Sequence, residues 1–227
     1  MRINCDYTFQ NYLVSDNNKG AIEAISSAMA LPGQIHNPLF IYGPVGVGKT
    51  HLLQAIAHEY TSASKIYYTT IEDFVNDIIH AIQHRRYVDF IERCLNLDAL
   101  LIDDIHLMKD KKFTLGELLS ILGRLYKAEK QIVLSADKPP RQIFNTKTKA
   151  FKMFQAGLVL KIKPPAYNDR LRFLQARARN TGLSFDNDIF EDLASTACPD
   201  FRELAGALAK TKFSSTVAPF RSINLTL

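Results

Sequence analysis

Cysteines and long apolar runs are scarce in this 227-residue chain. No hydrophobic stretch approaches the roughly 20 residues needed to span a bilayer, so we expect no transmembrane helix. The three cysteines, Cys5, Cys94 and Cys198, lie far apart and form no C-x-x-C pair, which argues against both disulfide bonds and a zinc site. Residues 1–6 lack the apolar core of a signal peptide, and we expect a cytoplasmic protein.

The chain also lacks internal repeats, low-complexity linkers and a strong excess of either charge. Hydrophobic residues make up 47% and charged residues 22%, which excludes a disordered chain and predicts a globular protein. The net charge of +5 permits nucleic-acid binding but does not require it, because an ordinary solvated surface gives the same balance.

The most informative segment that is present is a glycine-rich loop. It fits G-x-x-x-x-G-K-[ST], the phosphate-binding P-loop, with the residues Gly43, Pro44, Val45, Gly46, Val47, Gly48, Lys49 and Thr50. The apolar run 38–42 precedes it and the helix-like segment 51–57 follows it, which is the strand–loop–helix order that the motif requires. A glycine-rich turn that matches by accident seldom has these flanks, so the loop predicts nucleotide binding.

Each part of this loop has a chemical role toward a nucleotide. Glycines allow backbone N–H groups to turn inward around phosphate oxygens, and the N-terminus of the following helix adds positive potential. Lys49 would reach the β- and γ-phosphates, and the Thr50 hydroxyl would ligate Mg²⁺. The expected cofactors are therefore ATP or ADP with Mg²⁺.

A second motif is an apolar strand, residues 99–102, that leads into two carboxylates, Asp103 and Asp104. In this Walker B pattern, Asp103 would hold Mg²⁺ through its water shell and Asp104 would polarise the attacking water as a base. The alternative is an ordinary strand end with an acidic cap, which a P-loop in the same chain disfavours. Asp137 follows another strand, 131–135, and is either a polar group near the γ-phosphate or part of a turn.

Strand-like and helix-like segments alternate along the first 160 residues. The expected strands are short and rich in branched or aromatic residues: 39–42, 65–69, 99–102, 131–135 and 158–162. Their alternation with amphipathic segments such as 71–83 predicts an α/β fold, a parallel five-stranded sheet flanked by helices.

Only helical patterns follow Pro164 and Pro165. They cover residues 169–180, 188–196 and 201–210, the last with Asp200 as N-cap. We therefore expect an α/β nucleotide-binding core of residues 1–163 and a small three-helix lid of residues 164–227.

Together these motifs resemble the AAA+ domain of DnaA, the bacterial replication initiator. The similarity runs through nearly the whole chain, in the segments 7–12, 37–43, 49–52, 99–105, 135–140 and 201–208. It implies the AAA+ version of the predicted P-loop fold, with Tyr12 and His51 beside the nucleotide and Asp137 as the sensor 1 residue. It also implies that Arg202, on a sensor 2 helix, reaches the bound phosphates and distinguishes ATP from ADP.

The same resemblance implies an interface for single-stranded DNA. The family inserts helices between its second and third strands, here residues 71–96, where Ile79 falls at the apolar contact position. A basic loop that touches the DNA backbone is matched by Lys109, Lys111 and Lys112, while Phe113 replaces a usual basic residue. Lysines there would neutralise phosphates and make binding salt-sensitive; the alternative is a solvated basic loop.

One departure from the family lies at the arginine-finger position. Met153 occupies it, flanked by Lys149 and Lys152, and a methionine cannot donate hydrogen bonds to a γ-phosphate. A lysine is a point charge and not a planar fork, and a missing finger costs about 10³- to 10⁵-fold in turnover where one is used. We therefore expect weak or absent self-stimulated hydrolysis.

As a second departure, we expect neither the family's helix-turn-helix domain nor its helicase-loading domain within these 227 residues. Either an excised central domain or a short natural relative would show this. The expected function is an ATP-binding module of replication initiation that contacts DnaA-like protomers and single-stranded DNA.

The main alternative is a regulatory module without a finger, Hda-like, that binds nucleotide and acts through protein contacts with the initiator, the replicative helicase or the sliding clamp. Met153 favours the regulator, whereas Asp103, Asp104 and Arg202 favour the nucleotide switch. A helicase loader of the DnaC type is a third alternative, because it shares the fold.

Overall fold

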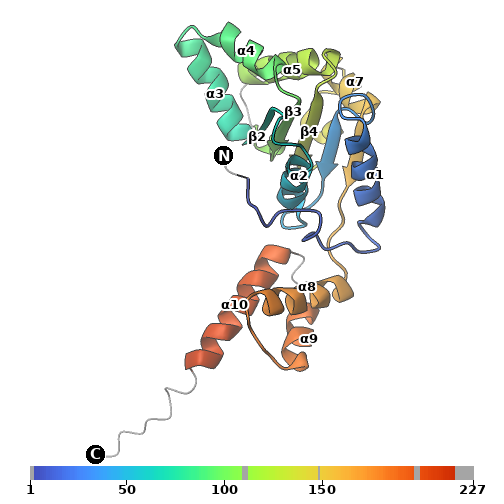
Figure 1. Cartoon of the computed structure of the whole chain (residues 1–227), viewed down its shortest axis with the longest axis vertical. Helices are drawn as coiled ribbons and strands as arrows, with labels where there is room; N and C mark the ends of the chain where they lie inside the picture. The colour runs from blue at the N-terminus through green and yellow to red at the C-terminus, as the bar shows by residue number, and fades with distance from the viewer. Residues whose placement is uncertain (1–2, 109–111, 148, 197–199, 218–227) are drawn as a thin grey trace, which may run out of the picture. The chain divides into compact units, whose positions relative to one another are not determined.

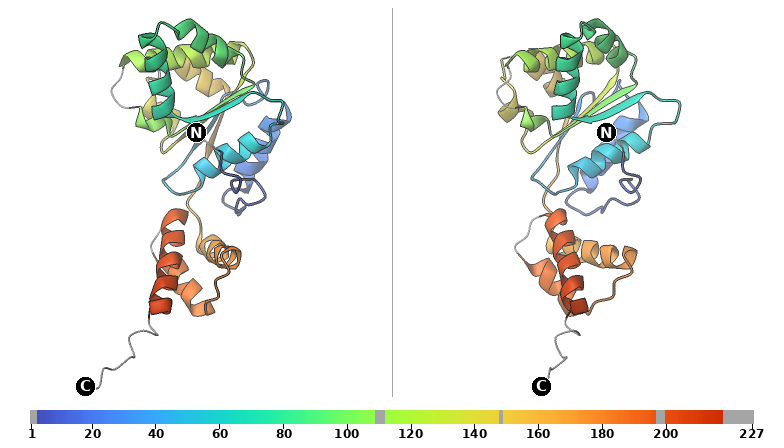
Figure 2. Two further views of the ribbon diagram at one scale, coloured as in Figure 1. Left: turned by 60° about the vertical axis from the view of Figure 1, so that its left-hand side comes forward. Right: turned by 90° about the vertical axis from the view of Figure 1, so that its left-hand side faces the viewer.

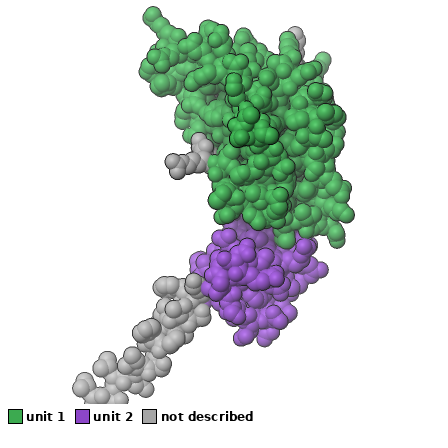
Figure 3. All heavy atoms as spheres, in the orientation of Figure 1, with its two compact units in different colours: residues 1–44, 48–163 green, residues 45–47, 164–227 purple. Residues whose placement is uncertain are grey.

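The computed structural model describes residues 3–108, 112–147, 149–196 and 200–217. The chain divides into two compact units, residues 1–44 with 48–163 and residues 45–47 with 164–227 (Figure 3). Within the described ranges, no helix is both long enough and apolar enough to cross a bilayer.

The first unit contains strands and helices in alternation. Its elements are α1 (Lys19–Ala30), β1 (Leu39–Tyr42), α2 (Lys49–His58), β2 (Ile66–Thr70), α3 (Ile71–Gln83), α4 (Tyr87–Leu95), β3 (Ala99–Asp103), the 3₁₀ turn η1 (Ile105–Leu107), α5 (Lys112–Lys127), β4 (Gln131–Ala136), α6 (Pro140–Ile143), α7 (Lys149–Ala156) and β5 (Leu158–Lys161).

The five strands are parallel and form one sheet in the order β2-β3-β4-β1-β5 (Figure 1). The predicted parallel five-stranded sheet is confirmed, and the strand bounds differ from the expected ones by at most a residue at each end. Because β1 lies between β4 and β5, the loop that follows β1 begins beside the end of β4. The Gly43 N–H accordingly donates to the carbonyl of Ala136 at 3.2 Å.

Helices cover both faces of this sheet (Figures 1 and 2). Leu100 and Ile102 of β3 belong to a buried cluster with α3, α4, α5 and α7 on one face. Leu101, between them, is also buried but points to the opposite face, where α1 and α2 lie. Strands that are buried on both faces read as continuous apolar runs, which is why the sequence predicts them so well.

The segment between β2 and β3 folds as the two helices α3 and α4. Thr70 begins α3 by accepting the Asp73 N–H on its hydroxyl, at 3.2 Å. Phe74 and Ile78 follow at helical spacing and are fully buried. The amphipathic helix predicted over residues 71–83 is confirmed with the same bounds.

The second unit is built around three helices, α8 (Tyr167–Asn180), α9 (Asn187–Ser195) and α10 (Phe201–Val217). They share a small apolar core made of Leu174, Ala178, Phe190, Ala194, Leu204 and Leu208. Asp200 caps α10 as predicted, because its Oδ1 accepts the N–H groups of Arg202 at 2.6 Å and Glu203 at 3.1 Å. The helix α10 is longer than expected, since neither glycine nor proline interrupts residues 211–217.

Candidate nucleotide-binding site

The glycine-rich loop of residues 43–50 joins β1 to α2 at the carboxyl end of the sheet. Gly46 and Gly48 have φ values of 73° and 94°, in the left-handed region that residues with a side chain rarely adopt. A β-carbon added at Gly48 would lie 3.0 Å from the ring of Tyr12. A glycine therefore fits this turn both by its backbone conformation and by the space available.

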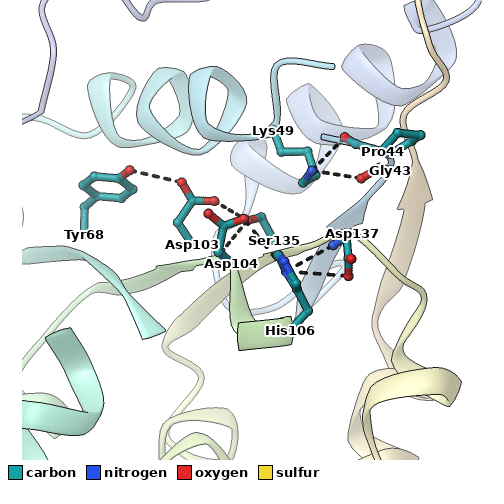
Figure 4. Close-up of polar contacts among 9 residues, drawn as sticks. All are labelled: Gly43, Pro44, Lys49, Tyr68, Asp103, Asp104, His106, Ser135 and Asp137. Carbon is teal, nitrogen blue, oxygen red and sulfur yellow. Dashed lines mark hydrogen bonds and ion pairs between the residues drawn. The ribbon is translucent and has the colours of Figure 1, made fainter. Parts of the chain in front are cut away.

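Lys49 is the first residue of α2 and is only 7% exposed. Its Nζ donates to the carbonyl oxygens of Gly43 at 2.8 Å and Pro44 at 2.9 Å (Figure 4). A buried ammonium group is stable only with acceptors around it. Phosphate oxygens are acceptors for the same group, and a helix N-terminus favours negative charge at this place. Thr50 follows in the first turn and is half-buried.

Asp103 ends β3 and is 3% exposed. Two hydroxyl groups hold its carboxylate: Ser135 of β4 donates to Oδ1, and Tyr68 of β2 donates to Oδ2 at 3.3 Å (Figure 4). Gln54 of α2 in turn donates to the Tyr68 oxygen at 3.0 Å. Burial, and then the charge of Asp103, raise the pKa of Tyr68 well above its ordinary value, so its hydroxyl remains a donor.

Asp104 leaves the strand in a left-handed conformation, with φ 55°. Its N–H donates to the Ser135 hydroxyl at 2.9 Å, so Ser135 bridges both residues of the acidic pair. Asp137 follows β4 and faces His106 of η1 (Figure 4). The Asp137 N–H donates to His106 Nδ1 at 3.3 Å. The side-chain oxygen Oδ1 of Asp137 is buried and has no hydrogen-bond partner among the described residues.

The sheet order explains why these residues meet. The strands β3 and β4 are neighbours, and β1 lies next to β4, so Lys49, Asp103 and Asp137 gather at one edge although they are far apart in the sequence. Sequence reasoning missed four residues of this network, which are Gln54, Tyr68, His106 and Ser135. Ser135 and His106 each lie within three residues of a predicted acid, but nothing in the sequence shows which strands are neighbours.

The predicted residues Tyr12 and His51 lie together beside the N-terminal segment. The His51 ring stacks on Tyr7 with 4.8 Å between ring centroids and meets the Tyr12 ring edge-on at 5.2 Å. His51 Nε2 lies 2.8 Å from the carbonyl of Thr8, and burial lowers the pKa of His51. A neutral ring that donates to this carbonyl fixes the N-terminal segment against α2. Direct contact of His51 and Tyr12 with a nucleotide stays a prediction.

The oxygen donors at this site suit a magnesium nucleotide better than an ion held by protein alone. Among the described residues, no three His, Cys, Asp or Glu side chains are grouped closely enough to hold a metal. Mg²⁺ usually keeps several waters and takes one or two protein oxygens together with phosphate oxygens. Thr50 and Asp103 offer such oxygens, and the unpartnered Asp137 Oδ1 is a further buried polar atom that a ligand would satisfy.

The remaining predicted site residues lie on other elements of the chain. Arg202 lies on α10 in the second unit and is exposed. Ile79 of α3 is half-buried against the core cluster. Lys109 and Lys111 lie outside the described residues. Lys112 is the first residue of α5, but its side chain is not among those that the structure describes. Their roles toward phosphates and DNA stay predictions.

Met153, at the predicted finger position, is a buried residue of α7. It is 8% exposed and belongs to the same apolar cluster as Phe154 and Phe144. Lys152, its neighbour, is exposed. An arginine placed at 153 would therefore have to leave the core before it could reach another molecule.

A separate cavity of about 760 Å³ lies between β2, α3 and α4. Tyr67, Asp77, His80, Arg86, Arg93 and Cys94 are among its lining residues. None of the predicted nucleotide-site residues lines it. The glycine loop and the acids that face it are therefore the better candidate for the functional site, because they combine glycines with positive φ, a buried ammonium and a buried unpartnered carboxylate oxygen.

Comparison with known families gives one match, "Bacterial DnaA ATPAse domain", over residues 3–161. Among curated proteins, a chromosomal replication initiator protein DnaA of Thermus thermophilus is 38% identical over 212 residues. That alignment covers 92% of this chain and 49% of the relative. The chain thus spans about half the length of the curated relatives that it matches.

Solved structures give the same result. Domain III of the Thermotoga maritima replication initiation protein DnaA superposes with a TM-score of 0.87 at 31% identity, covering 96% of this chain and 92% of that one. A replication initiator DnaA bound to AMPPCP and single-stranded DNA gives a TM-score of 0.85 at 26% identity, covering 96% of this chain and 69% of that one.

Proposed function

This chain belongs to the family of bacterial DnaA ATPase domains, and we propose that it is a nucleotide-dependent module of replication initiation that binds ATP with Mg²⁺ at residues 43–50. The observation that carries the proposal is the gathering of Lys49, Asp103 and Asp137 at the carboxyl ends of β1, β3 and β4 (Figure 4). Open α/β sheets bind ligands at this edge.

In this proposal, the loop N–H groups and Lys49 hold the phosphates, while Thr50 and Asp103 hold Mg²⁺. The ion would neutralise phosphate charge and polarise the reacting phosphoryl group. Asp104 would accept the proton of the attacking water, and Asp137 would contact the γ-phosphate. Arg202 would report the nucleotide state from α10.

Contacts beyond the nucleotide are part of the proposal. A related initiator has been solved with AMPPCP and single-stranded DNA, and this relationship supports DNA contacts by Ile79, Lys109, Lys111 and Lys112. Assembly with DnaA-like protomers in the cytoplasm is a further part of this proposal. Contacts with a helicase or a sliding clamp belong to the regulatory alternative.

Replacement of Lys49 by alanine tests the nucleotide site. The change removes the buried ammonium group, and we expect ATP–Mg²⁺ affinity, measured by titration calorimetry, to fall about 10- to 100-fold. The matched control is Lys127→Ala, which removes an exposed lysine of α5 and should leave affinity unchanged. If Lys49→Ala bound ATP as tightly as Lys127→Ala, this assignment would be wrong.

A second candidate function is the finger-deficient regulator, which the buried Met153 favours. A regulator of this kind would bind nucleotide and hydrolyse it slowly, and it would remain monomeric. Size-exclusion chromatography with ATP and with ADP separates the two: ATP-dependent self-assembly supports the initiator module, and a monomer with both nucleotides supports the regulator.

A further inference from the structure

One nitrogen of His106 faces two of the three acids at the candidate site. His106 lies in η1, and 19% of its side chain is exposed. Its Nδ1 lies 3.3 Å from the Asp137 backbone nitrogen, 3.7 Å from Asp137 Oδ1 and 3.9 Å from Asp104 Oδ1 (Figure 4). A single ring atom therefore links the end of β3 to the end of β4.

The local backbone explains this placement. Asp104 takes a left-handed conformation and turns the chain out of β3 into η1. The turn is fixed by two hydrogen bonds, from the Asp104 N–H to the Ser135 hydroxyl at 2.9 Å and from the Leu107 N–H to the Asp104 carbonyl at 2.9 Å. Because β4 is the next strand of the sheet, the turn brings the His106 ring in front of Asp137.

One polar group beside the ring, the Asp137 N–H, depends on it. The Asp137 N–H donates to Nδ1, which assigns the ring proton to Nε2 in the neutral form. The buried Asp137 Oδ1 has no hydrogen-bond partner among the described residues; Nδ1 lies 3.7 Å from it and, as an acceptor, does not bond to it. Without the ring, the Asp137 N–H would lose its acceptor, and the backbone that carries the Asp137 carboxylate would lose this restraint.

We propose that His106 is a positioning residue for ATP hydrolysis, which holds the backbone of Asp137 in place through Nδ1, the acceptor of the Asp137 N–H. The inference rests on the proposed function, because it needs a bound nucleotide on which Asp137 acts. The ring touches neither phosphate nor water in this role. Displacing a reacting group by about 1 Å can lower a rate about 100-fold, so the effect belongs to the chemical step and not to binding.

Three substitutions separate the polar atom from the bulk of the ring. His106→Asn places an amide atom where Nδ1 lies, and the amide can present either its oxygen or its NH₂ group there. His106→Leu keeps a branched side chain of similar size but offers no polar atom. His106→Ala removes both. The measurements are ATP affinity by calorimetry, the thermal midpoint, and single-turnover hydrolysis of prebound ATP.

We expect the leucine and alanine variants to hydrolyse prebound ATP about 10- to 100-fold more slowly than the natural chain while their ATP affinity stays within about 2-fold. The asparagine variant should recover most of the rate. If leucine were as active as asparagine, the ring would serve only packing and the inference would be overturned. The inference would also be overturned if the unsubstituted chain bound ATP but hydrolysed none of it. A natural chain without ATP binding would instead refute the proposed function.

Discussion

Replacement of Ser135 by alanine tests how the acidic edge of the site is held. The Ser135 side chain is fully buried; it donates to Asp103 Oδ1 and accepts the Asp104 N–H at 2.9 Å. Alanine would leave a buried carboxylate oxygen without its donor and a backbone N–H without its acceptor. Each unsatisfied buried group costs about 1–3 kcal/mol, so we expect the free energy of unfolding to fall by about 2–4 kcal/mol.

The assay is urea denaturation in the absence of nucleotide, with unfolding monitored by circular dichroism. The matched control is Ser120→Ala, at an exposed position of α5, which should change the free energy of unfolding by less than about 0.5 kcal/mol. A loss below about 0.5 kcal/mol for Ser135→Ala would refute the reasoning, since it would mean that neither group depends on this hydroxyl.

A double-variant cycle extends the same prediction to Tyr68. Tyr68→Phe removes the second donor to Asp103, at 3.3 Å, and also the acceptor of the Gln54 side chain. Because both hydroxyl groups donate to one carboxylate, their loss should not be additive, and we expect a coupling of about 0.5–3 kcal/mol. Additive effects within about 0.3 kcal/mol would show that the two hydrogen bonds act independently.

Three further predictions test the loop, the core and the buried thiol. Gly48→Ala should lower the free energy of unfolding, measured in urea titrations, by about 1–3 kcal/mol, because φ at this position is 94°. The control is Gly123→Ala in a helix, where a β-carbon would meet open space; this change should leave the free energy of unfolding unchanged or raise it. Met153→Arg should lower the free energy of unfolding by about 2–5 kcal/mol, because it places a charge in the core, whereas Met153→Leu should lower it by less than about 1.5 kcal/mol. Equal losses for the two variants would contradict the burial of Met153. Burial raises the pKa of Cys94 to about 11. In single-cysteine variants at pH 8, a thiol reagent should therefore label the exposed Cys5 readily and the buried Cys94 only on unfolding. Equally fast labelling of the two thiols would contradict the burial of Cys94.

The strands and the nucleotide loop were predictable because their signals are local. A strand such as 99–103 is buried on both faces, so every residue in it is apolar until the acid at its end. The loop needs glycines where φ is positive and a lysine at the helix start, and both requirements fall within eight consecutive residues. A single sequence window therefore contains all the information needed.

The supports of the acids were not predictable, because they depend on strand order. Tyr68 is 35 residues from Asp103, and Ser135 is 32 residues from it. Their alignment follows from β3 lying between β2 and β4, which no sequence window shows. The burial of Met153 was not predicted for a related reason. The finger position was inferred from neighbouring residues in the sequence, whereas the side of α7 that faces the core depends on its packing against the sheet, α5 and α6.

The balance of charge at the site predicts that Lys49 alone would not be enough to hold the proposed triphosphate. Lys49 contributes one positive charge, whereas Asp103, Asp104 and Asp137 contribute three negative charges at the same edge of the sheet (Figure 4). A highly charged anion would meet repulsion from these carboxylates at short range. The hydroxyl groups of Ser135 and Tyr68 donate hydrogen bonds to the Asp103 carboxylate and hold it in place. In the proposed function, Mg²⁺ held by Thr50 and Asp103 would offset this repulsion, so the carboxylates that would repel ATP alone would favour it together with the ion.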